Sequence, residues 1–313
     1  MAALRGKALI AYLLVCTVWG STYLAIRIGV GHLPPVLFAG VRFLVAGLLL
    51  GTIVLLAGGR LPHRRRDWWT LAITGLFLLV GGNAIVVWSE QYVESGQASV
   101  FVAAVPLWAA FFDSLVPGGK TTLTWRLCVG LALGFLGSAL LAGINPTELV
   151  AADLRGPVAL TLASASWAMG SVYWKRRPTE ASPYSAAAVQ MTIGGAVLTL
   201  AGLALGEGPA FHLTGAGLGS IAYLVVFGSI VGYTAYGYAL EHTSATIVGT
   251  YAYVNPVVAV ALGWLVLDEI VTGRMLLAMA LILGAVLWIQ FATRPVPKAE
   301  PAEARDLQRQ GAA

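Results

Sequence analysis

The sequence contains very little charge. Of its 313 residues, 11% are Asp, Glu, Lys or Arg, whereas 58% are hydrophobic. Soluble domains carry about 25% charged residues, so this composition cannot supply a water-exposed surface of the usual kind. The low charge excludes a soluble multidomain enzyme and a disordered chain. A polytopic helical membrane protein is the class that remains.

Cysteine and catalytic motifs are equally scarce. Cys16 and Cys128 are the only cysteines, and neither belongs to a CxxC or Cys/His pattern, so a disulfide scaffold is excluded. The four histidines fall in or beside expected loops, two toward each side of a membrane, so they offer no metal site or catalytic pair at one depth. No GxxxxGKS or GxxxxGKT nucleotide loop occurs. We therefore expect no metal, no other cofactor and no enzymatic activity.

What the sequence does contain is a series of ten long apolar runs. A membrane-spanning helix needs about 20 mostly apolar residues, and these runs lack the alternation of outer-membrane strands. We therefore expect an all-α polytopic membrane protein with ten transmembrane helices. The predicted spans are Ala8–Ile28, Val36–Leu56, Trp69–Trp88, Ala98–Val116, Leu123–Ile144, Pro157–Trp174, Ser185–Leu205, Leu218–Tyr238, Ala245–Leu267 and Met275–Phe291.

The basic residues indicate how these spans are oriented. If the N-terminus lies in the cytoplasm, 15 of the 19 Lys and Arg residues fall on the cytoplasmic side and 3 outside. Both termini are therefore expected in the cytoplasm, with the protein in the inner membrane. The net charge of +5 reflects this topology, and we expect no nucleic-acid partner because no continuous basic patch exists. Residues 293–313 are expected to form a disordered cytoplasmic tail.

The chain also repeats itself with a constant offset of 150 residues. The matched positions are Gly20 and Gly170, Ser21 and Ser171, Tyr23 and Tyr173, Ala46 and Ala196, Gly82 and Gly232, Pro106 and Pro256, and Gly134 and Gly284. Residues 8–144 and 157–291 would each hold five spans. Because five is odd, the second repeat would cross the membrane in the opposite direction. Inverted repeats of this kind are typical of secondary transporters that work by alternating access.

Three segments resemble a known transporter family. Val18–Tyr23, the Phe38–Ala46 pattern around Arg42, and the region from Asn255 to Gly284 are similar to motifs of the EamA branch of the drug/metabolite transporter superfamily. The resemblance covers residues 8–292 and implies two five-helix repeats and the export of amino acids or other metabolites. Related small multidrug-resistance proteins carry a glutamate in their first helix. The first span here has no acid, which argues against cation/proton exchange of that kind.

Arg42 is the most distinctive single residue. It lies in the outer half of the second span, where a charge is costly and is expected to face the interior of the bundle. Its planar guanidinium suits a substrate carboxylate or phosphate. A structural arginine that binds carbonyl groups or reaches outward along its stem is the alternative.

Polar and aromatic side chains near the middle of the other spans could line a central cavity. Rings would contact apolar parts of a substrate, and amides would orient polar parts. Packing between helices is the alternative for each of them. The candidate substrate-binding residues, with Arg42, are Trp19, Ser21, Asn83, Trp167, Ser171, Tyr236, Tyr251 and Asn255.

Pro106 and Pro256 are expected at equivalent mid-helix positions, where proline removes a backbone hydrogen bond. Paired kinks could act as a gate, or they could be static bends.

Most acids are expected at the periphery, Glu90 at the outer face among them. Asp113 is expected to pair with a cytoplasmic Lys or Arg. Proton coupling through Asp113 or Glu90 is a weaker alternative.

The sequence thus predicts a monomeric secondary transporter that exports small metabolites, most plausibly amino acids or related compounds. A single intramembrane arginine, no expected embedded acid and many aromatic residues favour this substrate class. An exporter of cationic drugs is the alternative, and a membrane protein without transport activity is a more distant one. The expected partners are a small-molecule substrate and the lipid bilayer.

Overall fold

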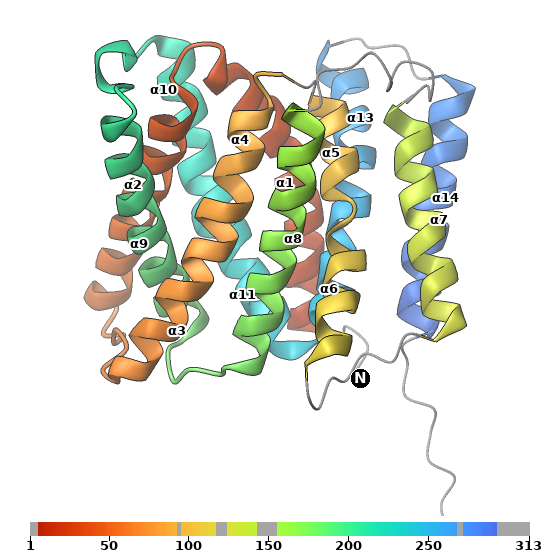
Figure 1. Ribbon diagram of the computed structural model, residues 1–313, viewed down its shortest axis with the longest axis horizontal. Coiled ribbons are helices and arrows are strands. Elements are labelled where there is room, and N and C mark those ends of the chain that lie inside the picture. The colour runs from red at the N-terminus through yellow and green to blue at the C-terminus, as the bar shows by residue number, and fades with distance from the viewer. Residues whose placement is uncertain (1–5, 93–94, 117–123, 143–154, 268–271, 293–313) are drawn as a thin grey trace, which may run out of the picture.

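The computed structural model describes residues 6–92, 95–116, 124–142, 155–267 and 272–292 (Figure 1). Within these residues every element is a helix and no strand occurs. The elements are α1 (Lys7–Val30), α2 (Pro35–Leu56), α3 (Arg65–Gly75), η1 (Leu76–Ala84), α4 (Ile85–Ser89), α5 (Ser95–Val102), α6 (Val105–Leu115), α7 (Trp125–Ala142), α8 (Arg155–Arg176), α9 (Pro183–Ala204), η2 (Gly208–Ala210), α10 (Gly215–Tyr223), η3 (Leu224–Val231), α11 (Gly232–His242), α12 (Ala245–Gly249), α13 (Tyr251–Leu267) and α14 (Gly273–Ala292).

Five helical segments are long and apolar enough to cross a membrane: Lys7–Val30, Pro35–Leu56, Arg65–Ser89, Pro183–Ala204 and Gly215–His242. Large apolar side chains cover their outer faces. Leu56 is 84% exposed and Leu200 is 67% exposed, as expected for residues that contact lipid tails rather than water. An all-helical, multi-pass membrane fold is therefore confirmed, while the total of ten spans stays a prediction.

Two of the predicted spans are broken helices. The fourth is divided into α5 and α6 at Ala103–Ala104, and the ninth is divided into α12 and α13 at Thr250. Pro106 consequently lies in the first turn of α6 rather than in mid-helix, so the prediction of a mid-helix proline is wrong there. A backbone N–H in the first turn of a helix has no acceptor within the helix, so proline, which lacks this N–H, is well suited to that position. Pro256 lies inside α13, as predicted.

The third and eighth predicted spans each contain a π-helical stretch. η1 lies between α3 and α4, and η3 lies between α10 and α11. When the chain is shifted by 150 residues, these two stretches overlap. Wider π turns inside α-helices are rare and are frequent at functional sites.

The helices of the two predicted repeats pack in matching pairs. α2 lies along α9, and α7 lies along α14 at one end of the bundle (Figure 1). α1 packs against α13 and α10–α11, while α8 packs against α5–α6 and η1. The first helix of each repeat therefore contacts the third and fourth predicted spans of the other, and the interior of the molecule is built from both.

Glycines bring α2 and α9 into close contact. A Cβ atom on Gly47 would lie 2.4 Å from the Thr192 backbone nitrogen, and one on Gly195 would lie 2.2 Å from the Leu44 nitrogen. Only residues without a Cβ permit such an approach of two backbones. This contact fixes the position of α2, and with it Arg42.

Candidate functional site

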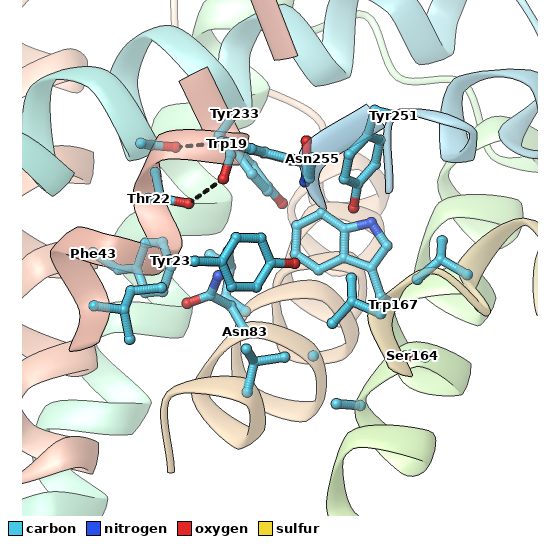
Figure 2. Close-up of a pocket in the computed structure, with 18 of the residues that line it drawn as sticks. Trp19, Thr22, Tyr23, Phe43, Asn83, Ser164, Trp167, Tyr233, Tyr251 and Asn255 are labelled. Carbon is cyan, nitrogen blue, oxygen red and sulfur yellow. Dashed lines mark hydrogen bonds between the residues drawn. The ribbon is translucent and has the colours of Figure 1, made fainter. Parts of the chain in front are cut away.

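A central cavity lies between the two halves of the chain. It receives residues from α1, α2, η1, α4, α5 and α6 on one side and from α8, η3, α11 and α13 on the other. Its free space, the open end included, is about 630 Å³. Six of the nine predicted binding residues line it: Trp19, Arg42, Asn83, Trp167, Tyr251 and Asn255. Figure 2 shows Asn83, Trp167 and Asn255 around a common centre, although they come from three separate helices.

Arg42 is the charged group in the cavity wall. It is 2% exposed, its Nε donates to the Ser229 hydroxyl at 3.0 Å, and its guanidinium lies 4.6 Å from the centre of the Phe43 ring. Its Nη1 has no hydrogen-bond partner among the described residues. A buried guanidinium nitrogen without a partner is costly. Arg42 is therefore held in place on one side and left with donor capacity that an anionic group could use.

The two asparagines of the cavity differ in their hydrogen bonds. Asn83 lies on η1, and its buried Oδ1 has no partner among the described residues. With the amide of Asn255 in its hydrogen-bonded orientation, the nitrogen donates to the carbonyls of Cys16 and Tyr251 at 3.2 Å each. Asn255 thus ties α13 to α1, whereas Asn83 offers an acceptor to the cavity.

Aromatic rings form much of the remaining wall. Trp19 donates through Nε1 to the Gly228 carbonyl at 2.9 Å. Its ring meets Trp167 edge-on with centroids 5.4 Å apart, and Tyr251 edge-on at 4.8 Å. These contacts hold the rings in defined orientations. The wall can therefore contact an apolar or aromatic group without much rearrangement.

Three predicted binding residues lie outside the cavity lining. The Ser21 hydroxyl is 2.5 Å from the Tyr223 hydroxyl, on another side of α1. Tyr236 accepts from Trp167 Nε1 at 3.2 Å, and its hydroxyl lies 2.5 Å from that of Ser171. Tyr236 and Ser171 therefore lie behind Trp167 and fix its orientation.

The lining also contains residues that were not among the nine predicted binding residues. They include Thr22, Tyr23, Ser164 and Tyr233. Tyr233 occupies the position that corresponds to Asn83 under the 150-residue offset, and Tyr23 belongs to the Val18–Tyr23 motif. Both signals were present in the sequence, but neither indicates which way a side chain faces.

Glu90 departs from its predicted place at the outer face. It follows the Arg65–Ser89 segment, its side chain is completely buried, and neither carboxyl oxygen has a hydrogen-bond partner among the described residues. The backbone explains this position, because Arg27 Nη1 donates to the Glu90 carbonyl at 2.6 Å and holds the end of α4 against α1. Burial raises the pKa of the Glu90 carboxyl well above its usual range, while the charges of Arg27 and Arg42 oppose the shift.

Asp113 pairs with a basic residue, as predicted. Arg176 Nη2 lies 2.6 Å from Asp113 Oδ1, and the two side chains are 23% and 13% exposed, respectively. The bond joins the end of α6 to the end of α8.

Within the described part of the chain, no three His, Cys, Asp or Glu side chains are grouped closely enough to hold a metal ion.

Known proteins match the chain along most of its length. The model of the EamA-like transporter family matches residues 6–143 and again residues 154–291. YedA of Escherichia coli strain K12, named as an uncharacterized inner membrane transporter, is 39% identical over 285 residues, which are 89% of this chain and 90% of YedA. A protein of Salmonella typhimurium named as a probable amino-acid metabolite efflux pump is 28% identical over 290 residues, which are 88% of this chain and 91% of the pump.

A solved structure shares the fold. One crystal structure superposes with a TM-score of 0.75 at 18% identity, covering 92% of this chain and 98% of the other. The family match spans nearly the whole chain, and the relative named as an inner membrane transporter agrees with the apolar helices described above. This protein is a multi-pass transporter of the inner membrane, and it belongs to the EamA-like transporter family.

Proposed function

We propose that the protein exports amino acids or closely related metabolites across the inner membrane by alternating access. The proposal includes ten spans in two inverted repeats, residues 8–144 and 157–291, with both termini and the tail in the cytoplasm. It also takes the monomer as the working unit, because ten spans can enclose a path within one chain. The two halves would move against each other and open the central cavity to one side at a time.

The observation that carries this proposal is the pair of unused polar atoms in the cavity. Among the described residues, the buried donor Arg42 Nη1 has no hydrogen-bond partner, and neither has the buried acceptor Asn83 Oδ1. A zwitterionic amino acid has a carboxylate for the first and an ammonium for the second. The aromatic wall of Trp19, Trp167 and Tyr251 would contact its side chain.

One relative supports the same substrate class. The Salmonella typhimurium relative is named as a probable efflux pump for amino-acid metabolites, and the alignment with it covers 88% of this chain. The name belongs to that protein. Because the alignment covers most of both chains, amino acids are the first class of compound to test here.

An exporter of cationic compounds is the second candidate. Tryptophan and tyrosine rings attract cations through their faces, and the buried Glu90, when it is ionised, carries a negative charge near the cavity. Arg42 in the cavity wall opposes a cationic ligand. Cationic compounds therefore fit the site less well than zwitterions do.

Counterflow in proteoliposomes tests the proposal. Radiolabelled L-phenylalanine, 3-phenylpropanoate and phenethylamine carry the same ring with both charges, the carboxylate alone or the ammonium alone. We expect exchange of the first two, and Arg42→Gln should weaken their apparent affinity by roughly ten- to a hundredfold, since a hydrogen bond to a charged group contributes about 1.5–3 kcal/mol. The matched control is Arg64→Gln, which removes an exposed arginine paired with Glu180.

Each alternative outcome has a clear meaning. Wild-type affinity in the Arg42→Gln variant would show that the arginine is not a binding group. Exchange of phenethylamine alone would favour the cationic exporter. Absence of exchange for all amino acids, in a folded sample, would overturn the proposed substrate class.

A further inference from the structure

A buried acid, Glu90, follows the end of α4. Both Glu90 carboxyl oxygens lack hydrogen bonds among the described residues, and the side chain has no exposed surface. Such a group in a folded protein is costly when ionised. Val86, one helical turn earlier on the same face of the helix, lines the central cavity. Glu90 is therefore placed just beyond the cavity wall.

The ionisable groups around Glu90 come from two neighbouring helices. Tyr23 and Arg27 of α1 and Arg42 of α2 all interact electrostatically with the carboxyl. Arg27 is exposed and uses Nη1 for the Glu90 backbone carbonyl, whereas Arg42 is buried. Arg155, at the start of the neighbouring α8, lies over the Tyr92 ring. Of the two arginines whose charges act on the Glu90 carboxyl, Arg27 and Arg42, Arg42 is thus the buried one.

Arg42 and Glu90 interact without a direct ion pair. Their charges attract each other, yet within the part of the chain that the structure describes Arg42 Nη1 and both Glu90 carboxyl oxygens have no hydrogen-bond partner. Two arrangements leave this buried region electrically balanced. In one, Glu90 is ionised and the cavity is empty; in the other, Glu90 is protonated and an anionic group lies at Arg42. Neither arrangement leaves a buried charge uncompensated, which would be strongly destabilising.

We propose that Glu90 is a proton-binding site of this transporter, and that its charge controls how strongly Arg42 attracts the carboxylate of a substrate. Glu90 acts through Arg42 and is a positioning residue rather than a substrate contact. The inference rests on the proposed function, because it assigns the cavity ligand a carboxylate. It adds a coupled proton to that function.

Proton binding and carboxylate binding then favour each other. Linkage between two sites is reciprocal, so each ligand changes the affinity of the other by the same factor. If one proton is taken up with each carboxylate, the apparent affinity for the carboxylate rises as the pH falls. The rise is up to about tenfold for each pH unit, over the range in which Glu90 of the empty protein is ionised. The proton and the substrate would cross the membrane in the same direction. Outward transport would then be driven by the concentration gradient of the substrate.

The first test follows the Glu90 proton directly and needs no substrate. Infrared difference spectra of the protein in nanodiscs, recorded between pH 5 and pH 9, should contain a protonated carboxyl band that disappears in Glu90→Gln. Arg42→Gln should move the titration of this band to higher pH by about one unit or more, because an ionised carboxylate loses its neighbouring cation. Arg42→Lys keeps the charge and should leave the midpoint nearly unchanged. A missing band, or equal midpoints in Arg42→Gln and wild type, would overturn the proposal.

The second test measures the coupling to a carboxylate. Binding of 3-phenylpropanoate, which stays ionised above pH 6 because a carboxyl group titrates near pH 4.3, should tighten as the pH falls from 8 to 6. Glu90→Gln imitates the protonated acid, so at pH 8 it should bind as tightly as wild type does at pH 6 and should lose the pH dependence. Glu180→Gln, which removes an exposed acid, is the control and should keep it.

These results separate the inference from the function on which it rests. Affinity that weakens on acidification would mean that the proton competes with the ligand, which contradicts the proposal. A pH dependence that survives in Glu90→Gln would assign the proton to another group. If the infrared band behaves as expected but no amino acid is exchanged, the Glu90–Arg42 linkage stands and the amino-acid assignment fails.

Discussion

The two halves of the chain supply different chemistry to one cavity. The first half contributes Arg42 to the lining and holds the buried Glu90 just beyond it. The matching positions in the second half hold Thr192 and Leu240. Asn83 likewise corresponds to Tyr233, and both line the cavity. Both halves thus contribute three aromatic rings to the lining, whereas its charged side chain, Arg42, comes from the first half.

The packing of the first helix of each repeat is alike in the two halves, because equivalent glycines there both lie against a neighbouring helix. A Cβ atom on Gly20 would lie 2.6 Å from the Val258 Cβ, and one on the equivalent Gly170 would lie 2.7 Å from the Phe77 Cβ. The helices of both halves approach each other so closely at these points that a larger residue must displace its neighbour. The two halves thus share a packing scaffold, and the selectivity proposed for the cavity rests on the side chains in which they differ.

The same asymmetry holds at the end of the bundle where Asp113 meets Arg176. This bond links the first half to the second, but the equivalent positions hold Gly263 and Ile26, which cannot form an ion pair. The largest expected effect comes from reversing one of these charges. Asp113→Arg should lower counterflow by more than about a hundredfold, because adjacent like charges cost several kcal/mol.

The charge swap completes this prediction. Asp113→Arg combined with Arg176→Asp restores opposite charges and should recover much of the counterflow. Glu180→Arg, opposite Arg64 on the surface, is the control and should have little effect because exposed pairs contribute at most about 1 kcal/mol. If the double variant is as inactive as Asp113→Arg alone, loss of the Asp113–Arg176 bond does not explain the inactivity.

The second prediction concerns the shared scaffold. Gly47→Ala should lower the free energy of unfolding by about 1–3 kcal/mol, the usual cost of overpacking a tight contact. Gly51→Ala, one turn later on α2, is the matched control because its Cβ would meet Ala188 Cβ at an ordinary 3.8 Å. Thermal unfolding in detergent compares the two variants, and equal stability would contradict the close α2–α9 contact.

The third prediction tests whether Asn83 and Tyr233 have diverged in role. Asn83→Leu removes the free acceptor and should weaken L-phenylalanine binding about two- to tenfold, the worth of one hydrogen bond, without changing 3-phenylpropanoate binding. Tyr233→Phe removes the bond that its hydroxyl donates to Gln190 Oε1 at 2.8 Å. Because that bond is internal, the variant should change stability rather than selectivity. Equal losses for both ligands in Asn83→Leu would contradict an ammonium contact.

Long apolar runs made the uninterrupted helices predictable from the sequence. The first span was expected at Ala8–Ile28 and is found as Lys7–Val30, and the seventh was expected at Ser185–Leu205 and is found as Pro183–Ala204. The break at Ala103–Ala104 was not foreseen, because its neighbours are as apolar as the helices themselves. The π-helical stretches were missed for the same reason.

The cavity was predictable in its residue types but less so in its geometry. Lipid and protein interior are both apolar, so hydrophobic periodicity does not reveal which face of a membrane helix points inward. Ser21 and Trp19 therefore looked equivalent, although only Trp19 lines the cavity. Glu90 was assigned to the periphery from its place near a helix end, and its burial depends on a contact from Arg27, 63 residues earlier in the chain.

The smallest expected effects come from the two equivalent prolines, and they should have opposite signs. Pro106 starts α6, where its fixed backbone angle favours the helix, so Pro106→Ala should lower the free energy of unfolding by about 0.4–1 kcal/mol. Pro256 interrupts α13, and Pro256→Ala gives the helix an N–H that can donate to the Ala252 carbonyl, a gain of about 0.6 kcal/mol. Thermal unfolding and counterflow should be measured on both. If Pro256 takes part in gating, the Pro256→Ala variant will be more stable and its counterflow slower. If its role is only structural, the variant will be more stable and its counterflow unchanged.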